Sequence, residues 1–177
     1  MRSLRVLITG ATSGLGRELA RQLARRRLSL ALTGRRKNLL EEACAEAKGL
    51  GADVLALPGS VTDRTTVREH YSRVKDRWGG LDWAVLNAAV GECGSAMDFK
   101  AEDYHEKLAV NVGGAANWIE AVLPDMLSAG SGTIAGIASL DAFRGLPGSG
   151  SYCASKAAMV CMLESVRVDV RGTGVRV

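Results

Sequence analysis

Hydrophobic residues along the chain form short continuous runs, separated by longer segments in which apolar residues recur every three or four positions. Short apolar runs are typical of strands buried on both faces, and the 3.6-residue period is typical of amphipathic helices. The pattern predicts strands at Leu4–Thr9, Leu28–Thr33, Asp53–Leu57, Leu81–Asn87 and Gly132–Ser139. It predicts helical segments at Arg17–Arg26, Asn38–Leu50, Asp63–Arg77, Ala101–Ser128 and Ser151–Arg171.

This alternation of strands and helices predicts an α/β fold with a doubly wound parallel sheet, a three-layer Rossmann fold. The length of 177 residues, of which 47% are hydrophobic, fits a single domain over residues 1–177. Within the long fourth helical segment, Gly113 and Gly114 indicate a close approach of another part of the chain, with a second helix as the simplest candidate. Pro124 lacks an amide hydrogen and is expected to kink or end that segment.

A glycine-rich turn follows the first predicted strand directly and leads into the first predicted helix. Its glycines are spaced by three residues and then by one, which lets backbone amides and a helix N-terminus approach a pyrophosphate without interference from a Cβ atom. A simple glycine-rich turn is the alternative, but the position in a strand–helix unit favours dinucleotide binding. The cofactor-binding candidates in this turn are Gly10, Thr12, Ser13, Gly14, Leu15 and Gly16.

Two arginines, Arg35 and Arg36, follow the second predicted strand. An NAD-binding domain usually has an acidic residue here, which binds the adenosine ribose hydroxyls and would repel a 2′-phosphate. Guanidinium groups can instead bind that phosphate through paired hydrogen bonds. The pair therefore favours NADP(H), with NAD(H) as the less favoured cofactor, although a surface arginine pair without a ligand would show the same residues.

Tyr152 and Lys156 stand four residues apart, on one face of the last predicted helix. An ammonium group beside a phenol favours the phenolate, so the pair can act as a general acid/base. Such pairs also occur by chance on exposed helices, and the interpretation therefore depends on the motifs elsewhere in the chain.

Taken together, these motifs resemble the short-chain dehydrogenase/reductase family over nearly the whole chain. The resemblance implies hydride transfer between a nicotinamide and a carbonyl or alcohol carbon, with Tyr152 as the acid/base. Lys156 would favour the phenolate and hold the nicotinamide ribose. Ser139 would bind the substrate oxygen, and Asn111 would position a water that relays protons to Lys156. In isolation, Ser139 could equally be a turn residue and Asn111 a buried polar group.

The resemblance also implies cofactor contacts after the third and fourth strands. Asn87, Ala88 and Ala89 resemble the family's Asn-Ala-Gly element, with Ala89 adding a Cβ where the backbone runs close to the cofactor. Ser60 and Val61 stand where the family often has Asp-Val at the adenine. Ser60 keeps a hydrogen-bonding group there but lacks the charge.

The composition argues against several other classes of function. The formal charge of +4 comes from scattered basic residues, and aromatic residues make up only 5%, so no nucleic-acid surface is indicated. Cysteines and histidines lack the spacing of a metal site, and Cys44, Cys93, Cys153 and Cys161 are interpreted as reduced thiols. The chain shows no signal-peptide pattern and no long apolar segment, which predicts a cytoplasmic protein without a membrane partner.

Family members usually continue well beyond Gly174–Val177, which resembles the opening of a sixth strand, so the domain is expected to be incomplete at its C-terminus. A non-catalytic nucleotide-binding fragment is therefore an alternative function, and an extended epimerase or dehydratase is a third, although its glycine spacing usually differs. The substrate is undetermined, with Glu92–Phe99 and Asp141–Ser149 expected to shape its pocket. The apolar stretch Ala157–Leu163 predicts a homodimer or homotetramer.

Overall fold

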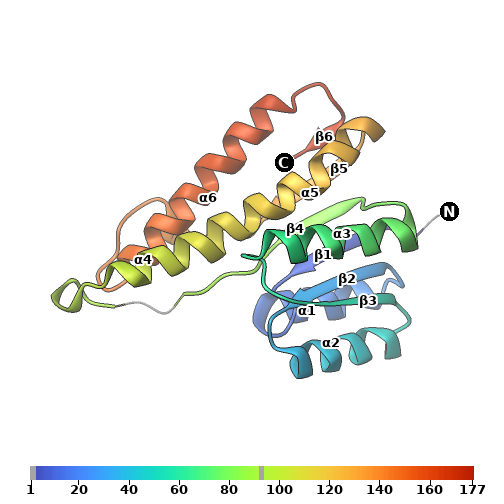
Figure 1. Cartoon of the computed structure of the whole chain (residues 1–177), viewed down its shortest axis with the longest axis horizontal. Coiled ribbons are helices and arrows are strands. Elements are labelled where there is room, and N and C mark those ends of the chain that lie inside the picture. The colour runs from blue at the N-terminus through green and yellow to red at the C-terminus, as the bar shows by residue number, and fades with distance from the viewer. Residues whose placement is uncertain (1–2, 92–93) are drawn as a thin grey trace.

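In the computed structural model, which describes residues 3–91 and 94–177, six parallel strands form one sheet with helices on both faces (Figure 1). The strand order is β3-β2-β1-β4-β5-β6, and every neighbouring pair is parallel. The strands are β1 (Arg5–Thr9), β2 (Ser29–Gly34), β3 (Asp53–Pro58), β4 (Trp83–Leu86), β5 (Gly132–Gly136) and β6 (Val175–Arg176). The predicted doubly wound fold and the start of a sixth strand are thus confirmed.

Two apolar cores sandwich the sheet, because successive side chains of each strand point to opposite faces. On one face, Val6 and Ile8 of β1 pack with α1 (Gly14–Ala24) and α2 (Lys37–Gly49). On the other face, Leu7 packs with α3 (Arg64–Trp78), α5 (Gly114–Ala129) and α6 (Gly150–Asp169). This division explains why the strands are continuously hydrophobic.

The fourth predicted helical segment is divided in the structure. It consists of α4 (Ala101–Lys107), a π-helical stretch η2 (Leu108–Gly113) and α5. Two short 3₁₀ turns, η1 (Ala96–Asp98) and η3 (Leu140–Ala142), lie in the connections before α4 and α6. A π-helical turn inserts extra backbone into a helix and occurs frequently at functional sites.

Of the kink or end expected at Pro124, the end is wrong, because α5 continues to Ala129, and the kink stays a prediction. Glu120 and Pro124 are both exposed, so the carbonyl that loses its amide partner lies on the solvent side, where water can bind it. Gly130 ends the helix instead, in the left-handed conformation that favours glycine.

The close approach expected at Gly113 and Gly114 is confirmed for Gly114. A Cβ atom at Gly114 would overlap the Val61 side chain, which belongs to the loop after β3 rather than to another helix. The Asn117 side-chain amide, one turn further along α5, donates to the Val61 carbonyl over 2.9 Å. Helix α5 therefore holds the loop that follows β3.

At the amino ends of the strands, a half-buried ion pair joins three elements. The Arg5 guanidinium donates to both carboxylate oxygens of Asp82, at 2.7 and 3.0 Å, and to the Trp78 carbonyl at 2.8 Å. Arg5 is only 8% exposed, so its charge depends on this carboxylate for compensation. The contact fixes the end of α3 against the first residues of β1 and β4.

We expect Asp82→Ala to lower the free energy of unfolding by about 2–4 kcal/mol, because it leaves a nearly buried guanidinium without its partner. Urea denaturation followed by circular dichroism measures this change. Lys37→Ala is the control, since its ammonium lies 4.0 Å from Glu41 on an exposed helix face, and it should cost less than about 0.5 kcal/mol. Equal losses in the two variants would contradict the role given to Arg5.

Candidate active site

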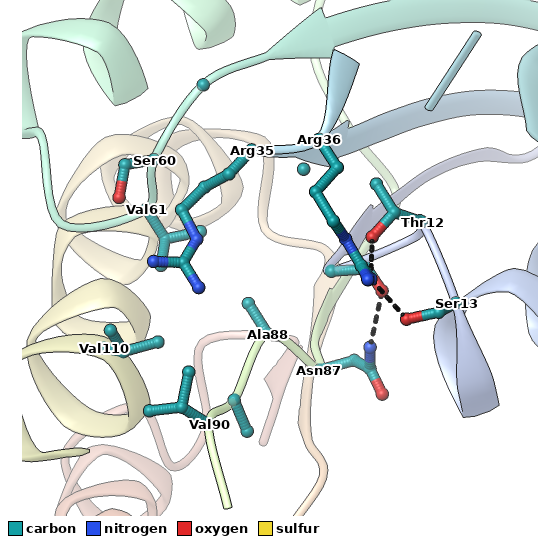
Figure 2. A pocket seen from close by; sticks show the side chains of 14 residues that line it. Thr12, Ser13, Arg35, Arg36, Ser60, Val61, Asn87, Ala88, Val90 and Val110 are labelled. Atoms are coloured by element: carbon teal, nitrogen blue, oxygen red, sulfur yellow. Dashed lines mark hydrogen bonds between the residues drawn. The ribbon is translucent and has the colours of Figure 1, made fainter. Parts of the chain in front are cut away.

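A cavity of about 580 Å³ opens at the carboxyl ends of the strands, where the order reverses between β1 and β4 (Figure 2). Open α/β sheets bind ligands at such a point, because neighbouring loops diverge there. The cavity is lined by Gly10, Thr12, Ser13, Gly34, Arg35, Arg36, Gly59, Ser60, Val61, Asn87, Ala88, Ala89, Val90 and Val110. Ten of these residues are among the predicted cofactor-binding positions.

The glycines after β1 are required by the close packing of this turn. Gly10 has a φ of +68°, and a Cβ atom on it would lie 2.8 Å from the Cα atom of Ala88. A Cβ atom on Gly16 would overlap the Gly10 carbonyl and lie 2.5 Å from the Asn87 amide nitrogen. Gly14 has a φ of +54°, and the neighbouring Leu15 side chain is 73% exposed. Gly14, Leu15 and Gly16 thus form the start of α1 rather than the cavity wall.

Asn87 and Thr9 join the ends of β4 and β1. The Asn87 side-chain amide donates to the Thr9 carbonyl at 2.9 Å and to the Gly10 carbonyl at 3.3 Å. In return, the Thr9 hydroxyl accepts from the backbone amides of Asn87 and Ala88, both at 2.9 Å. Sequence reasoning missed Thr9, whose signal is a buried hydroxyl at the end of an otherwise apolar strand. Ala89 has a negative φ, a backbone conformation that a residue with a Cβ atom adopts without strain.

The two arginines after β2 line the cavity mouth, and their side chains diverge from the end of that strand (Figure 2). Arg36 donates to the Thr12 hydroxyl at 2.8 Å and to the Ser13 hydroxyl at 2.6 Å. Arg35 extends toward Ser60 and Val61 on the opposite side (Figure 2). Within residues 3–91 and 94–177 no carboxylate pairs with either guanidinium, so the mouth carries two uncompensated positive charges suited to an anion.

Tyr152 and Lys156 lie in the first two turns of α6. Lys156 is only 2% exposed, and its Nζ donates to the Ile137 carbonyl over 2.7 Å. This Nζ lies 5.6 Å from the centre of the half-buried Tyr152 ring. Burial lowers the pKa of the Lys156 ammonium. The predicted pair is therefore brought together, with a desolvated cation close to the phenol.

Asn111 belongs to η2 and is 1% exposed. Its side-chain oxygen accepts from the Val90 amide at 2.8 Å, and its side-chain nitrogen donates to the Val90 carbonyl at 3.0 Å. The same nitrogen donates to the hydroxyl of Ser155 at 2.9 Å, and that hydroxyl donates to the Tyr152 carbonyl at 2.8 Å. The loop after β4 is thereby connected to α6. Sequence reasoning missed Ser155, although a serine inside the Tyr152–Lys156 segment could have indicated it.

Ser139 follows β5 and precedes η3. Its hydroxyl accepts from the Asp141 amide at 3.2 Å, so it caps that short turn as well as being the predicted substrate ligand. Ser139 lies two residues beyond Ile137, whose carbonyl anchors Lys156.

In the adjacent connection, Leu140 and Phe143 are 86% and 80% exposed and are available to an apolar substrate. Of the other expected pocket segment, Glu92 and Cys93 lie outside the described residues.

The part of the chain that the structure describes has no cluster of three or more side chains able to hold a metal ion. Cys44, Cys153 and Cys161 are free thiols, as expected, whereas Cys93 is not described. Among these same residues, no helix combines the length and the apolar character needed to cross a membrane.

Comparison with known proteins agrees with this geometry. A family model described as short chain dehydrogenase matches residues 5–177. An uncharacterized oxidoreductase of Myxococcus xanthus is 43% identical over 171 residues, which are 97% of this chain and 68% of that protein. The 3-oxoacyl-(acyl-carrier-protein) reductase FabG of Staphylococcus aureus is 30% identical over 172 residues, 97% of this chain and 70% of the relative.

Solved structures show the same similarity. An NAD⁺-bound xylitol dehydrogenase superposes with a TM-score of 0.95 at 27% identity, over 99% of this chain and 68% of that one. A metagenomic short-chain oxidoreductase in complex with NADP has a TM-score of 0.91 at 25% identity, over 99% and 79% of the two chains. The family match is consistent with the glycine turn, the Tyr152–Lys156 pair and the strand order of the sheet. The chain therefore belongs to the short-chain dehydrogenase/reductase family of NAD(P)-dependent oxidoreductases.

Proposed function

We propose that this chain is an NADP(H)-dependent oxidoreductase that interconverts a carbonyl and an alcohol, with Tyr152 as general acid/base. The observation that carries the proposal is the position of Arg35 and Arg36 at the mouth of the glycine-turn cavity, without acidic partners among residues 3–91 and 94–177. Relatives with NAD⁺ and with NADP share the fold, so the preference for NADP rests on these side chains.

The cavity fits a dinucleotide phosphate by its chemistry. Gly10 lines the cavity and lets the glycine turn pack closely against Ala88, where a side chain would collide, so backbone amides can approach a pyrophosphate. Arg36, oriented by Thr12 and Ser13, offers a preformed donor for a 2′-phosphate. Ser60 and Val61 form the wall on which the adenine would lie.

When bound, NADPH supplies the hydride that reduces the substrate carbon. The Tyr152 hydroxyl would donate a proton to the carbonyl oxygen, and Ser139 would hydrogen-bond that oxygen. Lys156, held by the Ile137 carbonyl, would stabilise the phenolate that remains. Asn111 acts through Ser155 to hold the first turns of α6 against the loop after β4, which keeps Tyr152 in position.

Substitution of Arg35 and Arg36 by alanine together tests the cofactor preference. Each charge-assisted hydrogen bond to the 2′-phosphate contributes about 1.5–3 kcal/mol, so NADPH affinity should fall at least about tenfold while NADH affinity stays nearly constant. Fluorescence titration with both cofactors measures this. Replacing Arg25 and Arg26 by alanine is the charge-matched control. Equal weakening for NADPH and NADH would refute the phosphate site.

Tyr152→Phe should lower carbonyl reduction by at least about 100-fold and leave NADPH affinity within about twofold, because only the proton-donating hydroxyl is removed. Lys156→Ala should lower both turnover and cofactor affinity, since it removes a charge and a ribose ligand together. Steady-state assays over a panel of ketones, paired with NADPH titration, separate the two effects. Tyr71→Phe, which loses a hydroxyl bound to Asp125 far from the cavity, is the control and should remain active.

The alternative is a non-catalytic nucleotide-binding protein. It would be favoured if the parent protein and all variants bind NADPH but convert no ketone or alcohol. Undiminished reduction by Tyr152→Phe would exclude the proposed acid/base.

We also propose self-association through α6 and the continuous segment formed by α4, η2 and α5. Val160, Met162 and Leu163 remain only partly buried in the monomer, and Leu108 of η2 is 40% exposed. Sedimentation equilibrium should give the mass of a dimer or tetramer, and Leu108→Glu should shift it toward the monomer. A monomeric mass for the parent at micromolar concentration would contradict this expectation.

A further inference from the structure

A buried histidine lies behind the cavity wall and takes no part in the proposed chemistry. His70, in the middle of α3, is 6% exposed. Its ring stacks on the ring of Trp118 in α5, with centroids 6.5 Å apart and planes inclined by 26°. Trp118 is itself 1% exposed, and its indole nitrogen has no hydrogen-bond partner among the described residues. The histidine is thus held between a rigid apolar surface and the loop after β3.

The other side of the His70 ring contacts the segment that forms the wall. The Pro58 backbone carbonyl lies near the ring and favours its protonated form. A Cβ atom on Gly59 would lie 2.5 Å from the Cγ2 atom of Thr66 and 3.0 Å from the Cε1 atom of His70, so the backbone rests closely on both side chains. Gly59, Ser60 and Val61 line the cavity directly. One layer of backbone therefore separates His70 from the nucleotide site.

Hydrogen bonds hold the wall at each of its three residues, and His70 packs behind the first of them, Gly59. The Gly59 amide donates to the Gly34 carbonyl at 3.1 Å, and the Val61 carbonyl accepts from Asn117 at 2.9 Å. Ser60, between these two residues, bonds to Thr62 of the same loop through their hydroxyls at 2.8 Å, and its backbone carbonyl accepts from the Asp63 amide at 3.2 Å. The Thr66 methyl group and the imidazole ring of His70 pack together against Gly59 from behind.

Burial lowers the pKa of His70 below its usual value of 6.5, and the charge of Arg73 acts in the same direction. The Pro58 carbonyl and the carboxylates of Glu69 and Asp63 oppose this effect. Glu69 and Arg73 lie on α3, Asp63 caps that helix, and Trp118 from α5 is uncharged. The ring is therefore neutral at pH 7. Because the folded state disfavours the protonated ring, its contribution to stability is lost as the pH falls below about 6.5.

We propose that His70 is a positioning residue whose neutral ring supports the Gly59–Val61 wall of the nucleotide site and withdraws that support when it is protonated. A charged imidazole requires water or an anion, and neither Trp118 nor the Gly59 backbone offers one. A bound nucleotide covers the wall and increases the cost of the charge, so nucleotide affinity decreases in acid. This inference rests on the proposed nucleotide site and adds a pH dependence to it.

The test is calorimetric titration with NADP⁺ at pH 7.5 and pH 5.5 for the parent, His70→Gln and His105→Gln. Glutamine is neutral at both pH values and keeps a hydrogen-bond donor. His105 lies on an exposed face of α4 and provides the control. The ionisation of the ligand's own 2′-phosphate affects all three proteins equally and cancels in their affinity ratios.

At pH 7.5 we expect similar affinities for the three proteins. Between pH 7.5 and 5.5, the parent and His105→Gln should lose about threefold to tenfold more affinity than His70→Gln, as the linkage of one proton allows. The inference would be overturned if all three proteins lose the same factor in NADP⁺ affinity between pH 7.5 and 5.5. It would also be overturned if His70→Gln binds more weakly at pH 7.5 but loses the same factor in acid, because His70 would then have a structural role only.

Amide hydrogen exchange of Gly59 to Val61 in the nucleotide-free protein separates this inference from the proposed function. After correction for the intrinsic pH dependence of exchange, protection of these amides should fall in acid for the parent and stay constant for His70→Gln. If the parent shows this difference in protection but does not bind NADP⁺, the nucleotide site is refuted, whereas the support of the wall by His70 stands. Equal protection in both proteins would refute the support itself.

Discussion

The reversal of strand order beside β1 is the constraint on which the site depends. β2 and β3 lie on one side of β1 and the later strands on the other, so the loops at the carboxyl ends must diverge between β1 and β4. Asn87 and Thr9 fix the width of this opening through hydrogen bonds in both directions. Gly10 and Gly16 allow that contact, because a side chain at either position would push the two strand ends apart.

The cofactor half and the catalytic half of the site are coupled through one buried amide. Asn111 binds both backbone groups of Val90, which lines the cavity, and also the hydroxyl of Ser155 on the helix that carries Tyr152. A hydrogen-bonded network buried away from water is rigid, because breaking any member leaves an unpaired polar group. The position of the phenol relative to a nucleotide is thus set by polar contacts rather than by the exposed loops.

Desolvation has different consequences at two buried basic side chains of this protein, Lys156 and His70. At Lys156 it lowers the pKa, but the Ile137 carbonyl accepts from the ammonium, so a charge is kept close to Tyr152. At His70 it favours the neutral ring, and the surroundings offer little to a charged one. The same physical cost thus serves the proposed catalysis at Lys156 and the proposed support of the wall at His70. The difference lies in the partner that each environment provides.

The sequence by itself determined the strands, most helices, the glycine turn, Arg36 and the Tyr152–Lys156 pair, because periodicity and motif spacing are local properties of the chain. It missed the π-helical stretch, and at Pro124 it predicted a kink or an end, although α5 continues to Ala129. The proline is tolerated because the carbonyl that loses its partner faces solvent, which the sequence alone does not tell. Only the tertiary structure decided that Thr9 and Ser155 join the residues of the site and that His70 packs behind the Gly59–Val61 wall. These contacts join residues from separate elements, and packing alone brings such residues within hydrogen-bonding distance.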